Sequence, residues 1–392
     1  MKSVLVIGGG FGGLEAAIFL KKNNYEVTLV SDRDYFFIYP TSIWIPTREK
    51  EFDEICIDLY ELQRVHGFKL IVDELTHIDA EQNSYTLASG EVLSSYDHVV
   101  LAMGASKVEH KGIEHTLSIC GEPEQSLEIR DALDALIKKG SGKICFGFGG
   151  NPKDSSSVRG GPAFELLFNT HNLLKKKGIR DNFELTFFAP MSEPGARMGE
   201  KALSMMDGFF KKLAIKEQFG KKIKSFQEDA IIFEDDTKLE SDLTMFIAAG
   251  SGHEVVQNSQ LPTNEAGFVK IDEYCRVIFD GMPKNIYAIG DTAALEGPVW
   301  RAKQGHIAEV MARNVAFNIS QADKGEVNLK SYKEHINILC LMDTGNGASL
   351  IYRDDKKAYM IPLPFIGHYM KKSWGVYAKL SKLGKIPRLF GL

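Results

Sequence analysis

The stretch Lys2-Ser3-Val4-Leu5-Val6-Ile7-Gly8-Gly9-Gly10-Phe11-Gly12-Gly13-Leu14-Glu15-Ala16-Ala17 decides the fold of this chain. An apolar run of strand length gives way to spaced glycines and then to residues that favour a helix. In a G-x-G-x-x-G turn the first glycine (Gly8) allows the tight turn, the second (Gly10) lets phosphates approach the backbone, and the third (Gly13) lets helix pack on strand. The stretch therefore predicts a strand, turn and helix that bind the pyrophosphate of a dinucleotide at the helix N-terminus.

The second strand, expected over residues 26–30, ends in Ser31 and Asp32. An acidic residue at this position usually binds the ribose hydroxyls of the dinucleotide. Either Ser31 or Asp32 can form hydrogen bonds there. A carboxylate alone at the strand end would favour a dinucleotide whose ribose has a free 2′-hydroxyl over one with a 2′-phosphate. Ser31 also forms hydrogen bonds, so this motif leaves the choice of cofactor open.

Composition places the chain among soluble globular proteins of two or three domains. It has 392 residues, of which 44% are apolar and 25% charged, so there is no compositional case for disorder. The five cysteines are widely spaced, odd in number and form no C-x-x-C, so we expect neither a disulfide framework nor a metal site. We expect no nucleic-acid partner. Because the first strand follows Met1 and Lys2 directly, we also expect no signal peptide and a cytoplasmic protein.

Two later segments are expected to form strands that end beside the bound dinucleotide. Residues 96–105 form an apolar strand that ends in small residues, among them Ala102 and Gly104. Residues 283–293 form another, which ends in Gly290 and Asp291. A Gly-Asp pair at such a strand end admits the backbone and lets the aspartate accept from the ribityl chain of FAD. A helix is expected from about Pro298 onward, with its positive N-terminal end stabilising charge on a reduced flavin.

Residues 142–152 are expected to form a second strand and glycine turn, which resembles an incomplete dinucleotide-binding fingerprint. Pro152 stands where the third glycine is needed, and a polar run follows instead of a helix. The helix is delayed until Gly160-Gly161-Pro162, where proline suits the first turn. We therefore do not expect a nicotinamide nucleotide to bind at this turn.

These features give the chain a resemblance to a known family. It resembles the two-dinucleotide-domain flavoproteins, most closely the sulfide:quinone reductase and flavocytochrome sulfide dehydrogenase branch, which are relatives of type II NADH dehydrogenase. The motifs that carry the resemblance are Gly8 to Gly13, residues 27–31 with 34–36 and Pro40, Ser118-Ile119-Cys120, residues 161–165, Gly290-Asp291, Lys303-x-Gly305 and Cys340-x-x-Asp343-x-Gly345.

The resemblance implies an α/β fold with two Rossmann-like, glutathione-reductase-like domains and a C-terminal membrane-docking segment. The expected limits are residues 1–112 and 253–330 for the FAD-binding domain, 113–252 for the second domain, and 331–392 for the C-terminal part. The expected cofactor is FAD. Its expected binding residues are Gly8, Gly10, Phe11, Gly12, Gly13, Ser31, Asp32, Pro40, Val72, Ala102, Gly104, Gly290, Asp291, Lys303 and Gln304.

The resemblance also implies the chemistry of the site. In this branch a cysteine thiolate attacks sulfur, and polysulfur grows between two cysteines across the flavin. Cys340 matches one of these bridging cysteines and Cys120 matches a third family cysteine, whereas Val158 and Arg159 stand where the second bridging cysteine belongs. We expect Cys340 to be a nucleophile of lowered pKa, with Arg159 as a neighbouring cation. Cys120 and Lys303 complete the expected catalytic set.

The C-terminal segment, residues 365–392, reads as an interfacial helix. It contains six Lys or Arg and no Asp or Glu. Ile366, Met370, Trp374, Tyr377 and Leu380 recur at helical spacing with lysines among them, a pattern typical of helices that lie on anionic lipid. The alternative is a helix packed on its own protein or in a dimer. We expect reversible docking that high salt partly releases.

The function that these residues favour is electron transfer from sulfide, or a related sulfur compound, through a cysteine and FAD to a membrane quinone. The expected place is the cytoplasmic face of the cell membrane, as a peripheral protein, with homo-oligomer formation left open. One alternative is a type II NADH:quinone oxidoreductase, which needs the Gly147 turn to bind nicotinamide. Another is a flavoprotein that has lost sulfide turnover and serves as an electron-transfer or binding partner.

Overall fold

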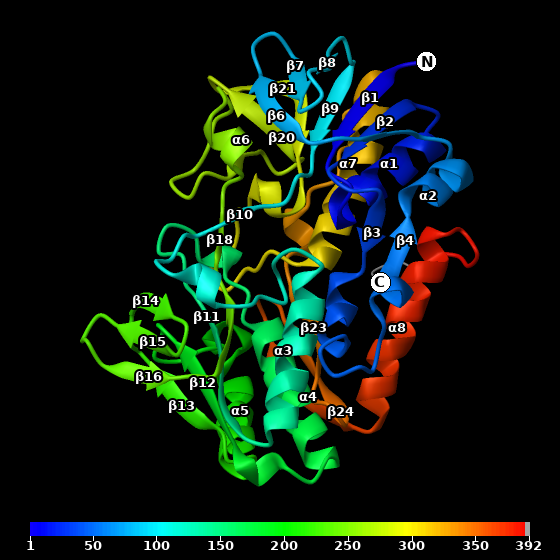
Figure 1. Ribbon diagram of the computed structural model, residues 1–392. Coiled ribbons are helices and arrows are strands. Elements are labelled where there is room, and N and C mark those ends of the chain that lie inside the picture. Colours follow the sequence, from blue (N-terminus) through cyan, green and yellow to red (C-terminus); the bar gives the residue numbers. More distant parts are fainter. Residues whose placement is uncertain (389–392) are drawn as a thin grey trace.

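The computed structural model describes residues 1–388 and has two sheet-centred lobes with a C-terminal layer between their edges (Figure 1). One lobe contains a six-stranded sheet and the other a four-stranded sheet. Both sheets are mainly parallel and covered by helices, as burial of both faces requires. The expected α/β class is confirmed.

The six-stranded sheet has the order β20-β21-β9-β1-β2-β5. Its strands are β1 (Ser3–Ile7), β2 (Glu26–Ser31), β5 (Lys69–Val72), β9 (His98–Leu101), β20 (Arg276–Phe279) and β21 (Met282–Ala288). All neighbours are parallel except β20 and β21. Helices α1 (Phe11–Lys22) and α7 (Gly305–Asp323) pack on each other beside it, and the small antiparallel sheet of β6 (Leu75–Asp79), β7 (Ser84–Leu87) and β8 (Val92–Leu93) belongs to the same lobe.

The four-stranded sheet has the order β13-β12-β11-β17 and is parallel throughout. Its strands are β11 (Gly142–Phe148), β12 (Phe183–Ala189), β13 (Lys216–Phe219) and β17 (Leu243–Ile247), and its helices are α3 (Gln125–Lys139), α4 (Gly161–Lys176) and α5 (Glu200–Lys212). The core under α4 is aromatic: the Phe164 and Phe187 rings stack with centroids 4.4 Å apart. The antiparallel strands β14 (Ile223–Gln227), β15 (Ala230–Phe233) and β16 (Lys238–Glu240) complete this lobe.

The loop after β11 differs from a dinucleotide turn, as the sequence predicts. The chain leaves β11, forms a short 3₁₀ turn at Ser155–Ser157, and begins α4 only at Gly161. Asn151 and Asp154 are buried in this loop, where Asn151 donates to the carbonyl of Gly250 over 2.8 Å. The loop therefore holds its own packed structure in front of the second sheet.

The C-terminal part is an antiparallel sheet and one helix. Strands β23 (Ile338–Asp343), β24 (Gly347–Arg353) and β25 (Ala358–Pro364) form the sheet, and α8 (Ile366–Lys382) packs on β24. The expected C-terminal helix is thus present, along the outside of the molecule (Figure 1). Among residues 1–388, no helix combines the length and apolarity needed to cross a membrane.

Shorter elements connect these layers. They are β3 (Tyr35–Phe37), β4 (Cys56–Asp58), α2 (Leu59–His66), β10 (Ser106–Lys107), β18 (Gly250–Ser251), α6 (Glu254–Gln257), β19 (Val269–Lys270) and β22 (Ala293–Ala294). The antiparallel pair β10 and β18 lies where the chain passes between the lobes. The domain limits given above remain predictions, although the six-stranded sheet does combine strands from residues 3–101 and 276–288.

The helix expected from Pro298 begins later than predicted. Arg301, Lys303 and Gln304 precede α7, whose first residue is Gly305. Gln304 has extended backbone angles of φ −138° and ψ 153°, and the Lys303 amide donates to the carbonyl of Ser156 over 3.0 Å. This link between the two lobes keeps residues 301–304 extended and places them at the wall of a cavity instead of inside a helix.

Candidate functional site

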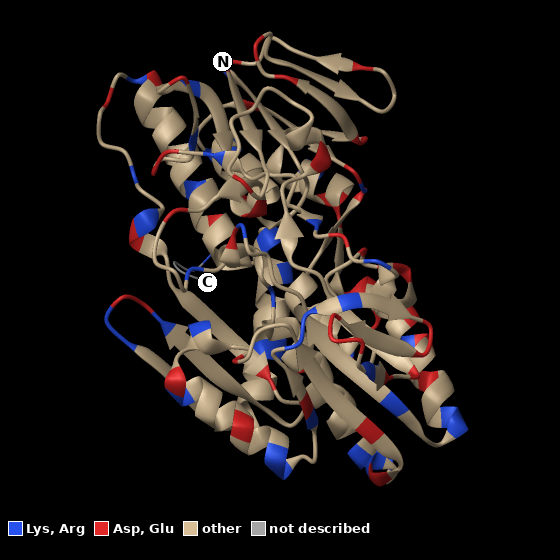
Figure 2. Cartoon of the chain, turned by 90° about the vertical axis from the view of Figure 1, so that its left-hand side faces the viewer, with Lys and Arg blue, Asp and Glu red and all other residues tan. Residues whose placement is uncertain are grey.

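A cavity of about 1800 Å³ lies between the lobes and extends to the C-terminal layer. Ligand pockets usually measure roughly 300–1,000 Å³, so this one has room for a large cofactor and a second molecule. Figure 2 shows acidic and basic residues interspersed over one side of the protein, with basic residues also along its centre, between the lobes. The glycine turn after β1, the β9 and β21 strand ends and the N-terminus of α4 all line the cavity.

The three fingerprint glycines have the geometry that a pyrophosphate cradle needs. Gly8 has a φ of +111°, and a Cβ there would lie 2.3 Å from the carbonyl oxygen of Ala102. At Gly13 a Cβ would lie 1.8 Å from the carbonyl oxygen of Gly8. A Cβ at Gly10, in contrast, meets nothing within 4 Å and would point into open space. Gly8 and Gly13 are therefore required by the turn itself, whereas Gly10 keeps room for a ligand.

The end of β2 places both ribose candidates at the cavity. Ser31 is buried, and Asp32 is half exposed and paired with Arg33 over 2.9 Å. Val72 differs from its prediction: it is 38% exposed and lies outside the cavity wall, which is formed instead by the next three residues, Asp73 to Leu75. The strand end was predicted at the right place, but the contact falls one residue further along.

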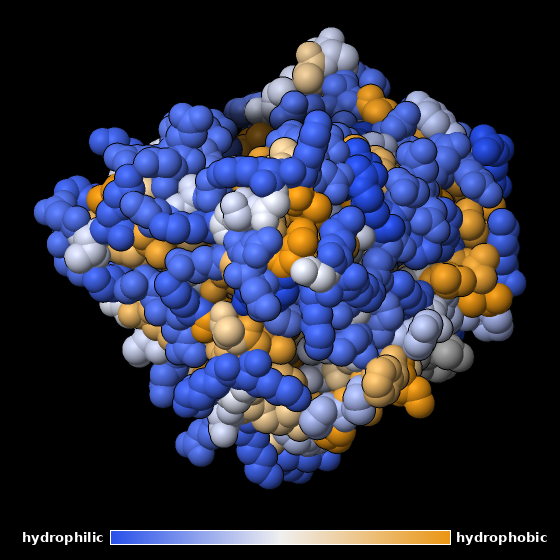
Figure 3. Space-filling view, turned by 60° about the horizontal axis from the view of Figure 1, so that its bottom comes forward, coloured by the Kyte–Doolittle hydropathy of each residue, from blue (hydrophilic) through white to orange (hydrophobic). Residues whose placement is uncertain are grey.

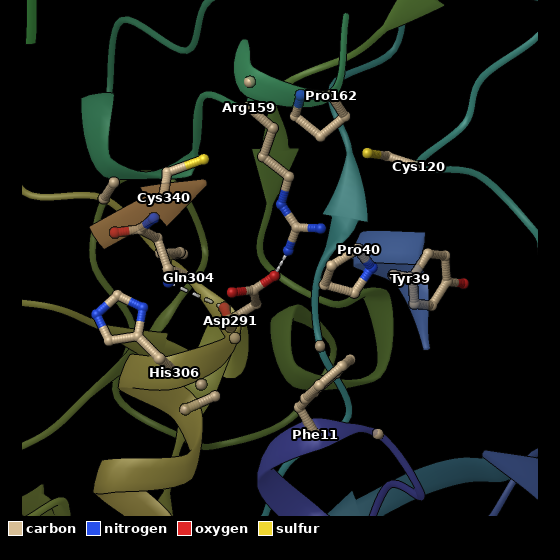
Figure 4. A pocket seen from close by; sticks show the side chains of 18 of the residues that line it. Phe11, Tyr39, Pro40, Cys120, Arg159, Pro162, Asp291, Gln304, His306 and Cys340 are labelled. Atoms are coloured by element: carbon tan, nitrogen blue, oxygen red, sulfur yellow. Dashed lines mark hydrogen bonds and ion pairs between the residues drawn. The ribbon is translucent and has the colours of Figure 1, made fainter. Parts of the chain in front are cut away.

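The Gly290-Asp291 turn lies opposite the fingerprint. Gly290 has a φ of +61°, and Thr292 accepts a hydrogen bond from the Gly104 amide over 3.0 Å, which joins the turn to the end of β9. Ala102, Gly104, Gly290 and Asp291 all line the cavity. The Asp291 carboxylate forms an ion pair with Arg159, whose side chain crosses the cavity from the start of α4 (Figure 4).

Lys303 lies behind this turn and supports it. Its ammonium donates to the carbonyl of Asp291 over 2.9 Å and to the carbonyl of Ala293, and it lies 3.6 Å from the ring centroid of Phe268. Burial lowers the pKa of Lys303 to about 7. Because its donors are engaged with backbone carbonyls, the geometry describes a positioning residue for the Asp291 turn.

The start of α7 completes the cofactor wall. Gln304, the residue before the helix, lines the cavity with Phe11, Gly12 and Pro40. Its side-chain nitrogen donates to the carbonyl of Leu339 over 3.4 Å, while its Oε1 is buried with no hydrogen-bond partner among the described residues. An unpartnered acceptor and the positive end of a 19-residue helix therefore face a region where a cofactor can bind.

Two cysteines line the cavity, and Arg159 lies between them in the close view (Figure 4). Burial, together with the nearby Glu165 carboxylate, raises the pKa of the Cys340 thiol to about 12. The expected lowering of its pKa by Arg159 is therefore wrong for this structure, because Arg159 points to Asp291. Cys120 lines the cavity on the other side of Arg159 (Figure 4). Cys145 and Cys275 are core residues, as predicted, and Cys56 is partly buried.

Beneath Cys340 lies a buried ionic network that the sequence did not indicate. Glu165 of α4 pairs with Lys371 of α8 and accepts a hydrogen bond from the Asp343 amide over 2.7 Å. Asp343 in turn accepts from the His368 ring over 2.7 Å, and the other ring nitrogen lies 3.1 Å from Glu49. Burial raises the pKa of Glu165, and the carboxylates around His368 raise its pKa to about 9. The network fixes α8 against the strand that bears Cys340.

The sequence motifs also did not identify two cations that line the cavity, Lys107 and Arg197. Burial lowers the pKa of Lys107 to about 8 and that of Arg197 to about 10. Arg197 donates to the carbonyls of Ser155 and Val158 and so holds the loop before α4. Lys107 follows the small-residue end of β9 by a few positions, but no motif marks it in the sequence. Only the pairing of β10 with β18 brings it to the cavity.

Comparison with known proteins identifies the family to which this chain belongs. The family model described as pyridine nucleotide-disulphide oxidoreductase matches residues 2–316. The chain belongs to this family, and it is an FAD-dependent oxidoreductase. The fit is visible in the structure, because the glycine cradle, the β2 end and the Gly290-Asp291 turn line one cavity of sufficient size.

Similar proteins include a sulfide-quinone reductase and type II NADH:quinone oxidoreductases. The sulfide-quinone reductase of Aquifex aeolicus is 27% identical over 96% of this chain and 90% of the relative. The type II NADH:quinone oxidoreductase Ndh of Mycobacterium tuberculosis is 24% identical over 82% of this chain and 74% of the relative. Among solved structures, the Aquifex aeolicus sulfide:quinone oxidoreductase superposes with a TM-score of 0.86 at 24% identity, covering 98% of this chain and 92% of that one. NDH2 of Plasmodium falciparum has a TM-score of 0.76 at 14% identity, covering 98% and 96%.

Proposed function

We propose that this protein oxidises sulfide, or a related sulfur compound, and passes the electrons through FAD to a quinone. The observation that carries the proposal is that one cavity contains the dinucleotide cradle and two thiols, Cys120 and Cys340. FAD supplies the capacity to take two electrons from sulfur and release them to a quinone. The similarity to a sulfide-quinone reductase over nearly the whole chain supports the same reading.

On the donor side, the burial of Cys340 beside Glu165 favours Cys120 as the first thiol to react. A thiolate is the reactive form, and nearby cations stabilise it whereas burial beside a carboxylate opposes it. Cys340 lies beside Glu165 with its pKa raised to about 12, whereas Arg159 lies between the two cysteines and is paired with Asp291 (Figure 4). This reverses the sequence-based preference for Cys340, whose role then becomes that of the second thiol.

On the acceptor side, the cavity reaches the surface helix α8. Ile366, Tyr369 and Met370 line the cavity and are also exposed, with exposed fractions of 63%, 69% and 49%. An opening lined by apolar side chains suits a lipid-soluble quinone. Figure 3 shows hydrophobic side chains in several places on this face, some of them toward the side on which α8 lies. We infer that this surface docks on the cytoplasmic face of the cell membrane, as a peripheral contact.

The nicotinamide alternative finds less support in the structure. Residues 151–160 occupy the space in front of β11 with packed side chains, and α4 begins after them instead of directly after the glycine turn. A helix N-terminus close behind the strand is what binds a pyrophosphate in such domains. The similarity to type II NADH:quinone oxidoreductases keeps this alternative as the second candidate.

Anaerobic reduction of the bound flavin separates the candidates. Sulfide is expected to bleach the flavin absorbance of the purified, FAD-loaded protein, and added quinone is expected to restore it. NADH alone is expected to leave the spectrum unchanged. Bleaching by NADH alone would contradict the proposal in favour of the second candidate. A flavin that responds to neither donor would favour an electron-transfer or binding protein.

The two cysteines are tested by stopped-flow reduction with sulfide. The Cys120→Ala variant is expected to lose at least a hundredfold in the rate of flavin reduction, because the thiol proposed to react first is gone. The Cys340→Ala variant is expected to retain a first reduction and to fail in repeated turnover. Cys275→Ala, a change in the core of the FAD lobe, serves as the control for packing effects. Normal reduction in both cavity variants would rule out this thiol mechanism.

A further inference from the structure

The far end of α8 packs on the lobe that carries the glycine fingerprint. Leu383, the residue after this helix, is 7% exposed and belongs to the same hydrophobic core as β1. One ring nitrogen of His66, at the end of α2, lies 2.6 Å from the carbonyl oxygen of Lys382. Figure 1 shows this end of the chain beside α2, whereas α8 begins near β24. The last turn of α8 and the residues after it are therefore part of the FAD lobe.

The group that this end of the chain contacts is Glu15 of α1. Its carboxylate is fully buried and lies one helical turn after Phe11, which begins α1 and lines the cavity. Lys382 Nζ lies 3.4 Å from Glu15 Oε2, and the Arg388 guanidinium pairs with the same oxygen. Arg313 of α7 lies 2.8 Å from Glu15 Oε1. In the described part of the chain, two of the three cations that pair with Glu15 therefore come from the C-terminal end.

Lys382 also contacts the first turn of α1. Its ammonium lies 5.5 Å from the ring centroid of Phe11 and 5.1 Å from that of Phe36. Phe11 directly follows Gly10, the position that keeps room for the pyrophosphate. The cation that compensates Glu15 is thus packed against the residue with which the phosphate-binding end of α1 begins.

A buried carboxylate at this place opposes binding of the cofactor unless its charge is compensated. The N-terminus of a helix binds phosphate through free N–H groups and a positive partial charge. Glu15 lies in the second turn of the same helix, and burial leaves its negative charge poorly screened by water. The ion pairs of the cluster join three cations to two carboxylates, because Glu309 of α7 also pairs with Lys382 over 2.7 Å. The cluster therefore keeps one positive charge in excess behind the fingerprint.

We propose that Lys382 and Arg388 are positioning residues for FAD, which compensate Glu15 and hold the phosphate-binding end of α1 in place. The C-terminal end of the chain then belongs to the cofactor site, although neither residue lines the cavity. Because coupling between two binding events is reciprocal, FAD in turn holds this end of the chain on the lobe. The inference does not depend on the electron donor, since every candidate function uses the flavin.

Equilibrium dialysis of the FAD-loaded protein tests the charge compensation. FAD affinity is expected to fall at least tenfold in Lys382→Met with Arg388→Met, which removes both charges and keeps apolar stems. Adding Glu15→Gln is expected to restore the affinity to within threefold of the parent, because the carboxylate that needs compensation is gone. Lys379→Met, at a lysine of the same helix that donates to the Glu54 carbonyl, is the matched control and is expected to bind FAD as the parent does. Unchanged affinity in the double variant, or no restoration by Glu15→Gln, would overturn the proposal.

Single variants at Arg388 separate positioning of the cofactor from stabilisation of the fold. Arg388→Lys keeps the charge and is expected to retain FAD as the parent does, whereas Arg388→Met is expected to release it at least threefold faster. The thermal unfolding midpoint at saturating FAD is measured for the same variants. A lower midpoint with unchanged FAD affinity would show that the cluster only stabilises the lobe, and the proposal would fall.

Limited proteolysis of the unchanged protein supplies the reciprocal readout. Trypsin can cleave after Lys382, whose side chain is 3% exposed, only when this end of the chain leaves the lobe. Saturating FAD is expected to slow this cleavage at least tenfold relative to protein depleted of FAD by dialysis. Cleavage after Lys222, whose side chain is 75% exposed on the second lobe, is expected to change less than threefold. Equal protection at both sites, or none after Lys382, would overturn the proposal.

Discussion

At the scale of single residues, the glycine fingerprint shows how much a sequence motif can predict. The strand, the turn and the helix start were predicted from residue types, and the structure gives Gly8 and Gly13 the close contacts that exclude a side chain. The same reasoning missed Lys107 and Arg197, because their role depends on which loops meet across the cavity. A motif carries its own geometry, whereas a charge brought in by long-range packing leaves no local pattern.

The different surroundings of Gly10 and Gly13 predict two different failures. Gly10→Val is expected to yield a folded protein without FAD, because its side chain enters open cavity space that the pyrophosphate needs. Gly13→Val is expected to lower stability or abolish soluble expression, because its Cβ would overlap the carbonyl of Gly8. Flavin absorbance per protein and the thermal unfolding midpoint measure the two effects. Full flavin content in Gly10→Val would show that the cofactor assignment is wrong.

At the scale of elements, boundaries were harder to predict than the elements themselves. The C-terminal helix was predicted from its periodicity and is present as α8, but α7 begins at Gly305 and not near Pro298. The cause is a contact between lobes, in which the Lys303 amide bonds to the carbonyl of Ser156 and holds the preceding residues extended. Local sequence favours a helix there, and a long-range hydrogen bond overrides it.

The His368 ring predicts a pH dependence for the attachment of α8. Hydrogen bonds to Asp343 and Glu49 raise the His368 pKa to about 9. A raised histidine pKa adds stability that is fully present below the ordinary value near 6.5 and is lost as pH rises through about 9. The shift corresponds to about 3 kcal/mol at most.

Urea unfolding at fixed FAD saturation measures this effect. Between pH 6.5 and pH 9.5 the parent is expected to lose more stability than His368→Gln, in which that dependence is absent. His115→Gln, at a largely exposed histidine, is the control. Identical pH profiles for the parent and His368→Gln would show that the protonated ring does not stabilise α8.

At the scale of the whole molecule, the basic tail has a different role from the one its composition predicts. Four basic residues of the tail form ion pairs with glutamates of the body: Lys371 with Glu165, Lys372 with Glu49, Lys382 with Glu309, and Arg388 with Glu15. In addition, Lys379 donates to the carbonyl of Glu54. Glu15 is fully buried, and the cations around it lower its pKa to about 2. The cations therefore attach α8 to an acidic body, and their binding to anionic lipid stays a prediction.

Membrane docking should accordingly depend on apolar side chains and hardly on salt. Phe365, Ile366 and Tyr369 are 73%, 63% and 69% exposed at the start of α8. Burying one such side chain contributes roughly 1.5–3 kcal/mol, so Ile366→Ser with Tyr369→Ser is expected to reduce vesicle binding at least tenfold. Truncation at Pro364 is a poor test, since it also removes Lys371 from buried Glu165.

Sedimentation with vesicles of phosphatidylcholine, with and without phosphatidylglycerol, measures the partition. The parent is expected to bind both vesicle types similarly, and high salt is expected to leave binding nearly unchanged, because five of the six tail cations already have protein partners. Val327→Ser, at an apolar side chain that is 92% exposed elsewhere on the surface, is the matched control and should bind as the parent does. Strong release by salt, or binding only to the anionic vesicles, would restore the electrostatic mechanism. Unchanged binding in the double variant would instead show that another surface makes the contact.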